Sequence, residues 1–200
     1  MKCTLFCTVV AMLCFAACSP GVDKKVKVMS SGKIQVDEAT KTVTLEPGTQ
    51  HNEVELSLSA KDKAVTVKSP NGDQTYEVPD AGVYLLNIKN DTLIGHLVNF
   101  GSGGIPSSIT TEQLEHIKDS AQQLLNGQNA SDANKTYFIV PKTIKKLTAN
   151  LNAQLINPYT NIPGSVSVDK DGKAPEIYKF ATAKQERQSL IELEERMNKK

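Results

Sequence analysis

Apolar and polar residues alternate in short runs through much of the first half of the chain. The clearest runs lie at 33–36, 42–45, 53–56 and 64–67. A period of two places one face of each strand on a core and the other in water, and the β-branched residues in these runs also favour strands. Turn signals separate the next runs, at 70–73, 79–82 and 90–91. Strands that recur about every 8–12 residues predict an antiparallel β-sandwich-like domain over residues 25–100.

Two segments of the second half carry apolar residues at helical spacing. The first begins at Thr110 and ends at Asn126-Gly127. Its apolar face consists of Leu114, Ile117, Ala121, Leu124 and Leu125. The second begins at Thr182, runs to near the C-terminus and has an apolar face of Leu190, Leu193 and Met197. A glutamine follows each threonine by three residues, at Gln113 and Gln185, which is the spacing of a capping box.

We expect the apolar face of the first helix to pack on the chain's own domain, with a partner's groove as the alternative. The pattern of the second helix lasts barely more than one heptad, because Glu186 and Arg187 interrupt it upstream. A coiled coil needs about three or four heptads. We therefore expect the second helix to pack intramolecularly and the protein to be monomeric.

The remaining segments are shorter. Residues 137–140 predict a buried strand that Pro141 ends. Residues 144–155 fit either a helix or a strand, and the poor helix formers Thr148, Asn150 and Asn152 favour extended structure. A glycine-rich run at 101–104 predicts a linker over 101–110. Residues 111–200 are then a mixed region with two amphipathic helices, and the predicted fold class is α+β.

The N-terminus has the order of a secretion signal. Lys2 supplies a positive charge, and the 14 residues from Thr4 to Ala17 carry none. That run is shorter than the roughly 20 apolar residues of a membrane-spanning helix. It suits the apolar region of a secretory signal, which is about 7–15 residues long and ends in small residues. Residues 1–17 are therefore predicted to be a signal peptide, and residues 18–24 a short polar tether.

The sequence Phe15-Ala16-Ala17-Cys18 resembles the lipobox of bacterial lipoproteins, although Phe15 stands where leucine is usual. The resemblance implies cleavage between Ala17 and Cys18, a diacylglycerol thioether on Cys18 and a fatty acyl group on the new amine. Ser19 follows Cys18. In the sorting rule of enterobacterial lipoproteins, only aspartate at that position retains the protein in the inner membrane, so Ser19 implies the outer membrane.

Composition agrees with an exported, lipid-anchored protein. All four cysteines lie in the first 18 residues, so the processed chain would have neither a disulfide nor a cysteine-ligated metal. Removal of residues 1–17 also removes Lys2 and leaves 22 Lys and Arg residues against 22 Asp and Glu residues. This balance disfavours nucleic-acid binding, which needs a basic surplus or stripe.

Candidate chemistry is sparse. None of His51, His96 and His116 has a second histidine or a carboxylate at metal-ligand spacing. Asp169-Lys170-Asp171-Gly172 starts like a calcium loop, but Lys173 and Phe180 stand at the fifth and twelfth positions, so a polar turn is expected. Ser30-Ser31-Gly32-Lys33 matches the SxxK motif of penicillin-binding proteins, without the KTG element that belongs with it. The sequence therefore identifies no catalytic, cofactor-binding or metal-ligating residue.

The predicted function is that of a lipid-anchored cell-envelope protein acting as a non-enzymatic binding or structural module. The alternative is an envelope hydrolase acting on glycan or peptide, with a site assembled only in the fold. A cleft with at least two convergent ionisable groups of shifted pKa would favour the enzyme. A flat, exposed apolar patch would favour an interaction module.

Cys18→Ala should abolish attachment of the lipid, because alanine has no sulfur to form the thioether. Labelling with a fatty-acid analogue should be lost, and the protein should leave the membrane fraction or accumulate unprocessed. A Cys18→Ala protein that still carries fatty acid would contradict the assignment. Fractionation to the inner membrane would contradict the expectation from Ser19.

Overall fold

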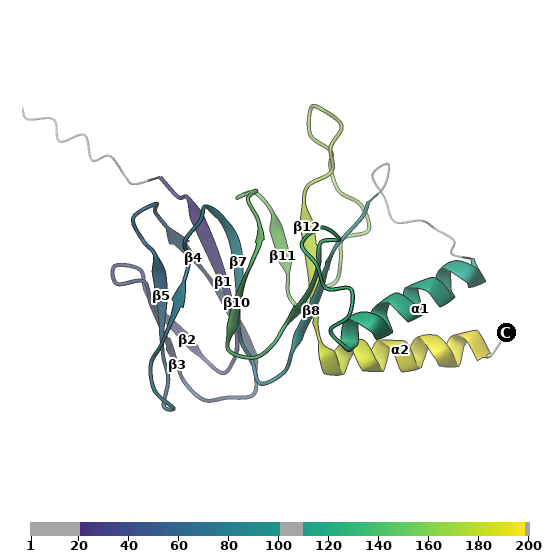
Figure 1. Cartoon of the computed structure of the whole chain (residues 1–200), viewed down its shortest axis with the longest axis horizontal. Helices are drawn as coiled ribbons and strands as arrows, with labels where there is room; N and C mark the ends of the chain where they lie inside the picture. The colour runs from purple at the N-terminus through teal and green to yellow at the C-terminus, as the bar shows by residue number, and fades with distance from the viewer. Residues whose placement is uncertain (1–20, 101–109, 199–200) are drawn as a thin grey trace, which may run out of the picture.

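The computed structural model describes residues 21–100 and 110–198. In this part of the chain, twelve strands form three four-stranded sheets, and two helices lie beside the third sheet (Figure 1). The predicted α+β class is confirmed. The signal segment, Cys18, Ser19 and most of the 101–110 linker lie outside the described residues.

Sheet A is the central layer. From edge to edge its strands are β10 (Thr143–Thr148), β7 (Gly82–Ile88), β1 (Lys24–Ser31) and β4 (His51–Leu58). Residues 82–87 of β7 are all buried, so both faces of this strand are covered. A strand covered on both faces reads as an almost continuous apolar run rather than as an alternation. This explains the sequence Val83-Tyr84-Leu85-Leu86 in β7.

Sheet B covers one face of sheet A. Its strands, in order, are β2 (Ile34–Asp37), β3 (Thr42–Leu45), β5 (Ala64–Lys68) and β6 (Gln74–Glu77). Alternate residues of the two sheets meet in one apolar cluster that includes Val26, Val28, Leu56, Leu86, Val43 and Val65. The period-two runs therefore form strands whose apolar sides face each other across this layer, as the alternation predicts.

Sheet C covers the opposite face of sheet A. Its strands, in order, are β11 (Gln154–Ile156), β12 (Ile177–Thr182), β8 (Leu93–Leu97) and β9 (Thr136–Ile139). The second apolar cluster joins Met29 and Leu85 of sheet A to residues of sheet C that include Leu93, Tyr137, Tyr178 and Phe180. The buried Tyr137 hydroxyl donates to the carbonyl of Leu147 in β10 at 2.7 Å, which ties the two sheets together.

The antiparallel arrangement expected for residues 25–100 is wrong for two strand pairs. β1 pairs with β7 in parallel, and β3 pairs with β5 in parallel. Alternation identifies a strand but does not identify its neighbour, and parallel neighbours need only a long enough connection between them. The sheets also exchange strands across the expected linker, because β8 joins sheet C and β10 joins sheet A.

The two helices have the predicted caps. In α1 (Thr111–Leu125), Thr110 and Gln113 form a reciprocal capping box. In α2 (Ala183–Asn198), the Thr182 N–H donates to Gln185 Oε1 at 3.0 Å, and the Gln185 N–H donates to Thr182 Oγ1 at 3.2 Å. The helices lie side by side and extend away from the sheets (Figure 1). No helix among the described residues is long and apolar enough to cross a membrane.

The helix pair is anchored at one end. Ile94, Leu124 and Ala183 form a small buried cluster where α1 and α2 meet sheet C. Towards the other end, Lys118 Nζ lies 3.9 Å from Glu194 Oε1, and Leu190, Leu193 and Met197 are half-buried. The apolar face of α2 therefore packs within the chain, as expected. Ile117 and Ile191 remain 47 % and 51 % exposed.

The shorter segments have the predicted local structure. Residues 137–139 lie in β9, and the 144–155 segment is extended, with a turn between β10 and β11. Asp169 forms a polar turn, its Oδ1 accepting from the Asp171 and Lys173 N–H groups. Tyr159, in the turn after β11, is 61 % exposed, whereas Tyr137 and Tyr178 are buried.

Gly95→Ala should destabilise the fold by about 1–3 kcal/mol, the usual cost of overpacking a core. Gly95 in β8 lies opposite Phe180 of β12, and a Cβ on Gly95 would overlap the buried Phe180 ring. Urea denaturation measures the change. Gly164→Ala is the matched control, because nothing lies within 4 Å of a Cβ built there. Equal stability of the two variants would contradict the packing described.

Candidate functional site

A cleft opens between α1, α2 and the outer face of sheet C. Its volume is about 710 Å³, and it is lined from β8 and β9, from the first turn of α2 and from one face of α1. A second hollow of about 360 Å³ lies between α2 and the turn formed by residues 157–161. Ile94, His96 and Glu186 line both hollows. We call the two together the helix–sheet cleft.

The apolar wall of the helix–sheet cleft comes mainly from α1. Ile117, Ala121 and Leu124 line it from the helix, and Ile94 lines it from β8. Leu124 is buried at the anchored end, whereas Ile117 lies nearly two turns earlier and is 47 % exposed. Because the sheet contacts α1 at its C-terminal end, Ile117 and Ala121 of the predicted stripe face the cleft.

Two ionisable groups, His96 and Glu186, line both hollows. His96 belongs to β8, where its neighbours across the sheet are Thr136 and Lys179. It is open to water, but protein surrounds it on most sides at the base of the cleft. Desolvation lowers the pKa of His96, and the Lys179 ammonium lowers it further. Desolvation also raises the pKa of Glu186 in the first turn of α2.

The environment therefore favours the uncharged form of both side chains. Within the described ranges, no side-chain hydrogen bond or ion pair engages His96, His116 or Glu186. A neutral imidazole carries one donor and one acceptor nitrogen. His96 and Glu186 can thus accept hydrogen bonds from, and donate hydrogen bonds to, an uncharged polar group that lies against the apolar wall.

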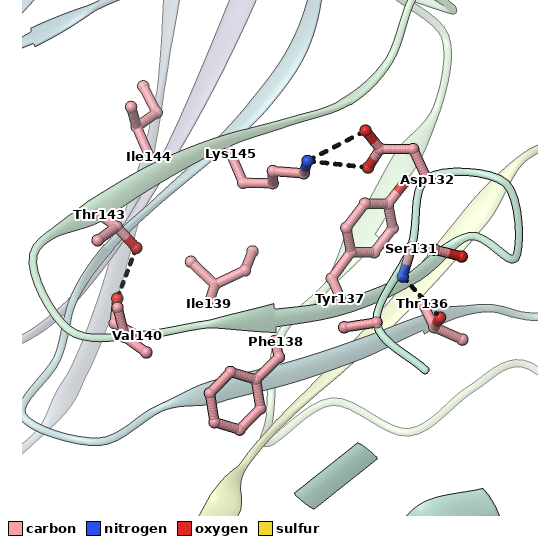
Figure 2. Close-up of a pocket in the computed structure, with 11 residues that line it drawn as sticks. Ser131, Asp132, Thr136, Tyr137, Phe138, Ile139, Val140, Thr143, Ile144 and Lys145 are labelled. Carbon is pink, nitrogen blue, oxygen red and sulfur yellow. Dashed lines mark hydrogen bonds and ion pairs between the residues drawn. The ribbon is translucent and has the colours of Figure 1, made fainter. Parts of the chain in front are cut away.

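A narrower slot of about 220 Å³ lies between β9 and β10 (Figure 2). Its polar side chains already have partners. Lys145 Nζ lies 3.0 Å from Asp132 Oδ1, and the Thr143 hydroxyl donates to the Val140 carbonyl at 2.7 Å. Figure 2 shows both pairs along the walls of the slot. Because these groups satisfy one another, the slot offers a ligand less than the cleft does.

The structure separates the residues that the sequence singled out. His96 and His116 both line the helix–sheet cleft, while His51 lies at the edge of sheet A. Ser30 is 2 % exposed and its hydroxyl donates to the Ser31 carbonyl at 3.3 Å, so the SxxK match is not a nucleophile site. The described residues hold no group of three His, Cys, Asp or Glu side chains that could bind a metal ion.

Glu186 is the site residue that the sequence did not reveal. It appeared there only as a charge that interrupts the apolar pattern of α2. A glutamate in the first turn of a helix is common, because it complements the helix dipole. Nothing in its local sequence therefore distinguishes it from an ordinary surface residue.

Comparison with known proteins adds no family. No protein-family model matches the chain, and no curated protein or solved structure gives a significant match. The functional argument consequently rests on the residues and geometry described above.

Glu186→Gln should stabilise the protein at neutral pH more than at acidic pH. Burial raises the pKa of Glu186, so its stabilising contribution is complete below the ordinary glutamate pKa and is lost as pH rises through the raised value. Glutamine resembles the protonated form. Urea denaturation at about pH 4 and about pH 7.5 measures the difference. Glu195→Gln, on an exposed part of the same helix, is the control. An equal effect of Glu186→Gln at both pH values would contradict the desolvation of Glu186.

Proposed function

We propose that this protein is a lipid-anchored component of the bacterial cell envelope and acts as a non-enzymatic binding module with its ligand in the helix–sheet cleft. The anchor would be the lipid on Cys18, with the outer membrane as the location that Ser19 implies. The observation that carries the binding role is the partly uncovered apolar wall of the cleft, formed by Ile94, Ile117 and Leu124.

The size and lining of the cleft indicate the ligand's chemistry. A volume of about 710 Å³ suits a small organic molecule, since such sites are typically about 300–1,000 Å³. Ile94, Ile117 and Leu124 favour an apolar body. His96 and Glu186 favour an uncharged hydrogen-bonding group, because their surroundings favour the uncharged form of both side chains. We propose an amphipathic, uncharged small molecule.

The arrangement of the layers supports the same role. Sheets A and B would serve as a sandwich-like scaffold between the tether and the binding end of the molecule. Figure 1 shows the start of β1 on the side of the molecule away from the helices. Lys24 already belongs to β1, so the tether before the sheet is residues 18–23, which span at most about 21 Å at about 3.5 Å per extended residue. The cleft would then face away from the membrane that holds the lipid.

An envelope hydrolase acting on glycan or peptide is the second candidate. The specific observation in its favour is that His96 and Glu186 share the cleft and have pKa values shifted in opposite directions. Peptide hydrolysis by a serine- or cysteine-type mechanism would need a hydroxyl or thiol hydrogen-bonded to a base, and glycan hydrolysis would need a second carboxylate placed across the bond from Glu186. Among the described side chains, His96 and Glu186 have no such hydroxyl partner. We therefore favour binding over hydrolysis.

Nile red, a neutral apolar dye that fluoresces on burial, is the probe for the cleft. Ile117→Ser should weaken its binding about fivefold, because removal of a half-buried isoleucine costs roughly 1 kcal/mol of apolar contact. Fluorescence titration of the lipidated protein in detergent, against a detergent blank, gives the affinity.

Ile191→Ser is the matched control for this experiment. Ile191 is equally exposed, at 51 % against 47 % for Ile117, but it does not line the cleft. The control should bind Nile red as the wild type does. Equal Nile red affinities for Ile117→Ser and Ile191→Ser would contradict the proposal that the cleft is the binding site. Turnover of a glycan or peptide that Glu186→Gln abolishes would favour the hydrolase instead.

A further inference from the structure

A cluster of polar side chains joins the edge of sheet A to the turn at residues 157–161. His51 begins β4, and its ring centroid lies 4.9 Å from that of Tyr159 in the turn. His51 Nε2 lies 3.4 Å from Glu53 Oε2. Lys27 Nζ is 2.8 Å from the other oxygen of the Glu53 carboxylate. Lys89 Nζ lies 5.6 Å from the centre of the Tyr159 ring, within cation–π range.

Three polar atoms of this cluster are shielded from water without forming a hydrogen bond to a described residue. They are both ring nitrogens of His51 and Oε2 of Glu53, whose separation from Nε2 does not have hydrogen-bond geometry. Leaving such groups unpaired is costly. Closure of the turn over His51 therefore has an energetic cost that opening of the turn to water would remove.

Hydrogen bonds within the turn and from Lys179 hold residues 157–161 in place. Asn157 Oδ1 accepts from the Tyr159 N–H at 2.8 Å and from the Thr160 hydroxyl at 3.2 Å. Lys179 of β12 donates to the carbonyls of Asn157 and Thr160 at 2.6 and 2.7 Å. These bonds hold the turn to sheet C. They do not involve sheet A, which the turn reaches through Tyr159 and Asn157.

Charges face His51 from every element packed against it. Lys27 on β1 and Lys89 after β7 are cationic, Glu53 on β4 is anionic, and Tyr159 covers the ring. Burial lowers the pKa of His51, and Lys89 lowers it further, against the attraction of Glu53. Burial alone would raise the pKa of Glu53, but Lys27 and Asn157 hold it below the ordinary value, so Glu53 stays charged. A protonated His51 would place three cations beside one carboxylate.

We propose that His51 is the sensor of a pH-dependent latch: the uncharged ring holds the 157–161 turn against the edge of sheet A, and protonation of His51 releases it. Release lets water reach the ring nitrogens and separates His51 from the Lys89 ammonium. The turn remains on sheet C through Lys179.

The sign of the effect follows from the two states of His51. In the open state the ring is solvated and has the ordinary histidine pKa of about 6.5. In the closed state the pKa is lower. The closed state is therefore fully stable above about pH 6.5 and loses stability as pH falls from there to the lowered pKa.

The latch also borders the helix–sheet cleft. Pro158 and Asn161 line the smaller hollow, and Gln185 Nε2 donates to the Pro158 carbonyl at 3.4 Å. Opening of the turn would displace one wall of that hollow. Ligand binding should then weaken on acidification, a consequence that rests on the proposed function, whereas the latch itself does not.

NMR of the His51 and Tyr159 rings tests the latch in the lipidated protein in detergent, because opening breaks the contact between these two rings. The nuclear Overhauser effect between the rings is followed from about pH 7.5 to about pH 5. In the wild type, the ratio of closed to open turn should fall about tenfold for each unit by which the closed-state pKa lies below the open-state value, and the signal should weaken accordingly. His51→Phe keeps a ring to contact Tyr159 but cannot take up a proton, so its signal with Tyr159 should not change with pH.

Two further variants identify the sensor. His96→Phe removes the other histidine with a lowered pKa, which lies beside Lys179, and the pH step should persist. Glu53→Gln removes the carboxylate that favours the charged ring, and the step should move to lower pH. A step that survives His51→Phe, a step lost in His96→Phe, or no step in the wild type would overturn the latch.

Nile red affinity at the same pH values separates the latch from the proposed function. A wild-type affinity that falls with acidification, against a constant affinity in His51→Phe, supports the coupling. A loss of the ring contact on acidification without any change in affinity leaves the latch standing and overturns its link to the cleft.

Discussion

Burial of sheet A on both faces is the constraint on which the other layers depend. Neighbouring side chains of β7 point in opposite directions, so Leu85 belongs to the cluster with sheet C and Leu86 to the cluster with sheet B. A one-residue slip of this strand would exchange the two sets. β7 pairs with β1 on one side and with β10 on the other. It is therefore an inner strand of sheet A, and sheets B and C can pack on its two faces.

The two faces of sheet A are covered unequally. The cluster with sheet C is apolar beside β7 and β10, where Leu85 and Leu147 contribute. Beside β1 and β4 the same face carries the ion pairs Lys25–Glu55 and Lys27–Glu53. Because charged groups keep some solvent access, the 157–161 turn covers that half instead of a packed strand. Movement of the turn away from this polar half would expose few apolar side chains and would therefore cost little free energy.

The helix–sheet cleft arises because the helices cover only part of the outer face of sheet C. Sheet C uses its inner face for the central core, and the helix pair covers its outer face at the end marked by Ile94, Leu124 and Ala183. Ile117 is then left facing open space beside His96 and Glu186. An amphipathic helix that is anchored at one end offers apolar surface for a ligand without a separate binding domain. The cleft, the turn at 157–161 and the latch residue His51 lie in one continuous path from sheet A to α2.

Local signals determined the elements of this protein, because period-two alternation and capping boxes act within a few residues. Both capping boxes, at Thr110 and Thr182, and most of the strands could be predicted in this way. Strand neighbours, the position of Tyr159 and the convergence of His96 with Glu186 could not, because they depend on contacts between residues far apart in the chain. The sequence by itself determined where the chain is extended or helical, and it predicts how the chain is exported and anchored. Only the tertiary structure decided which apolar residues stay uncovered and which histidines lose water, since burial and desolvation are properties of the packed layers and not of any one segment.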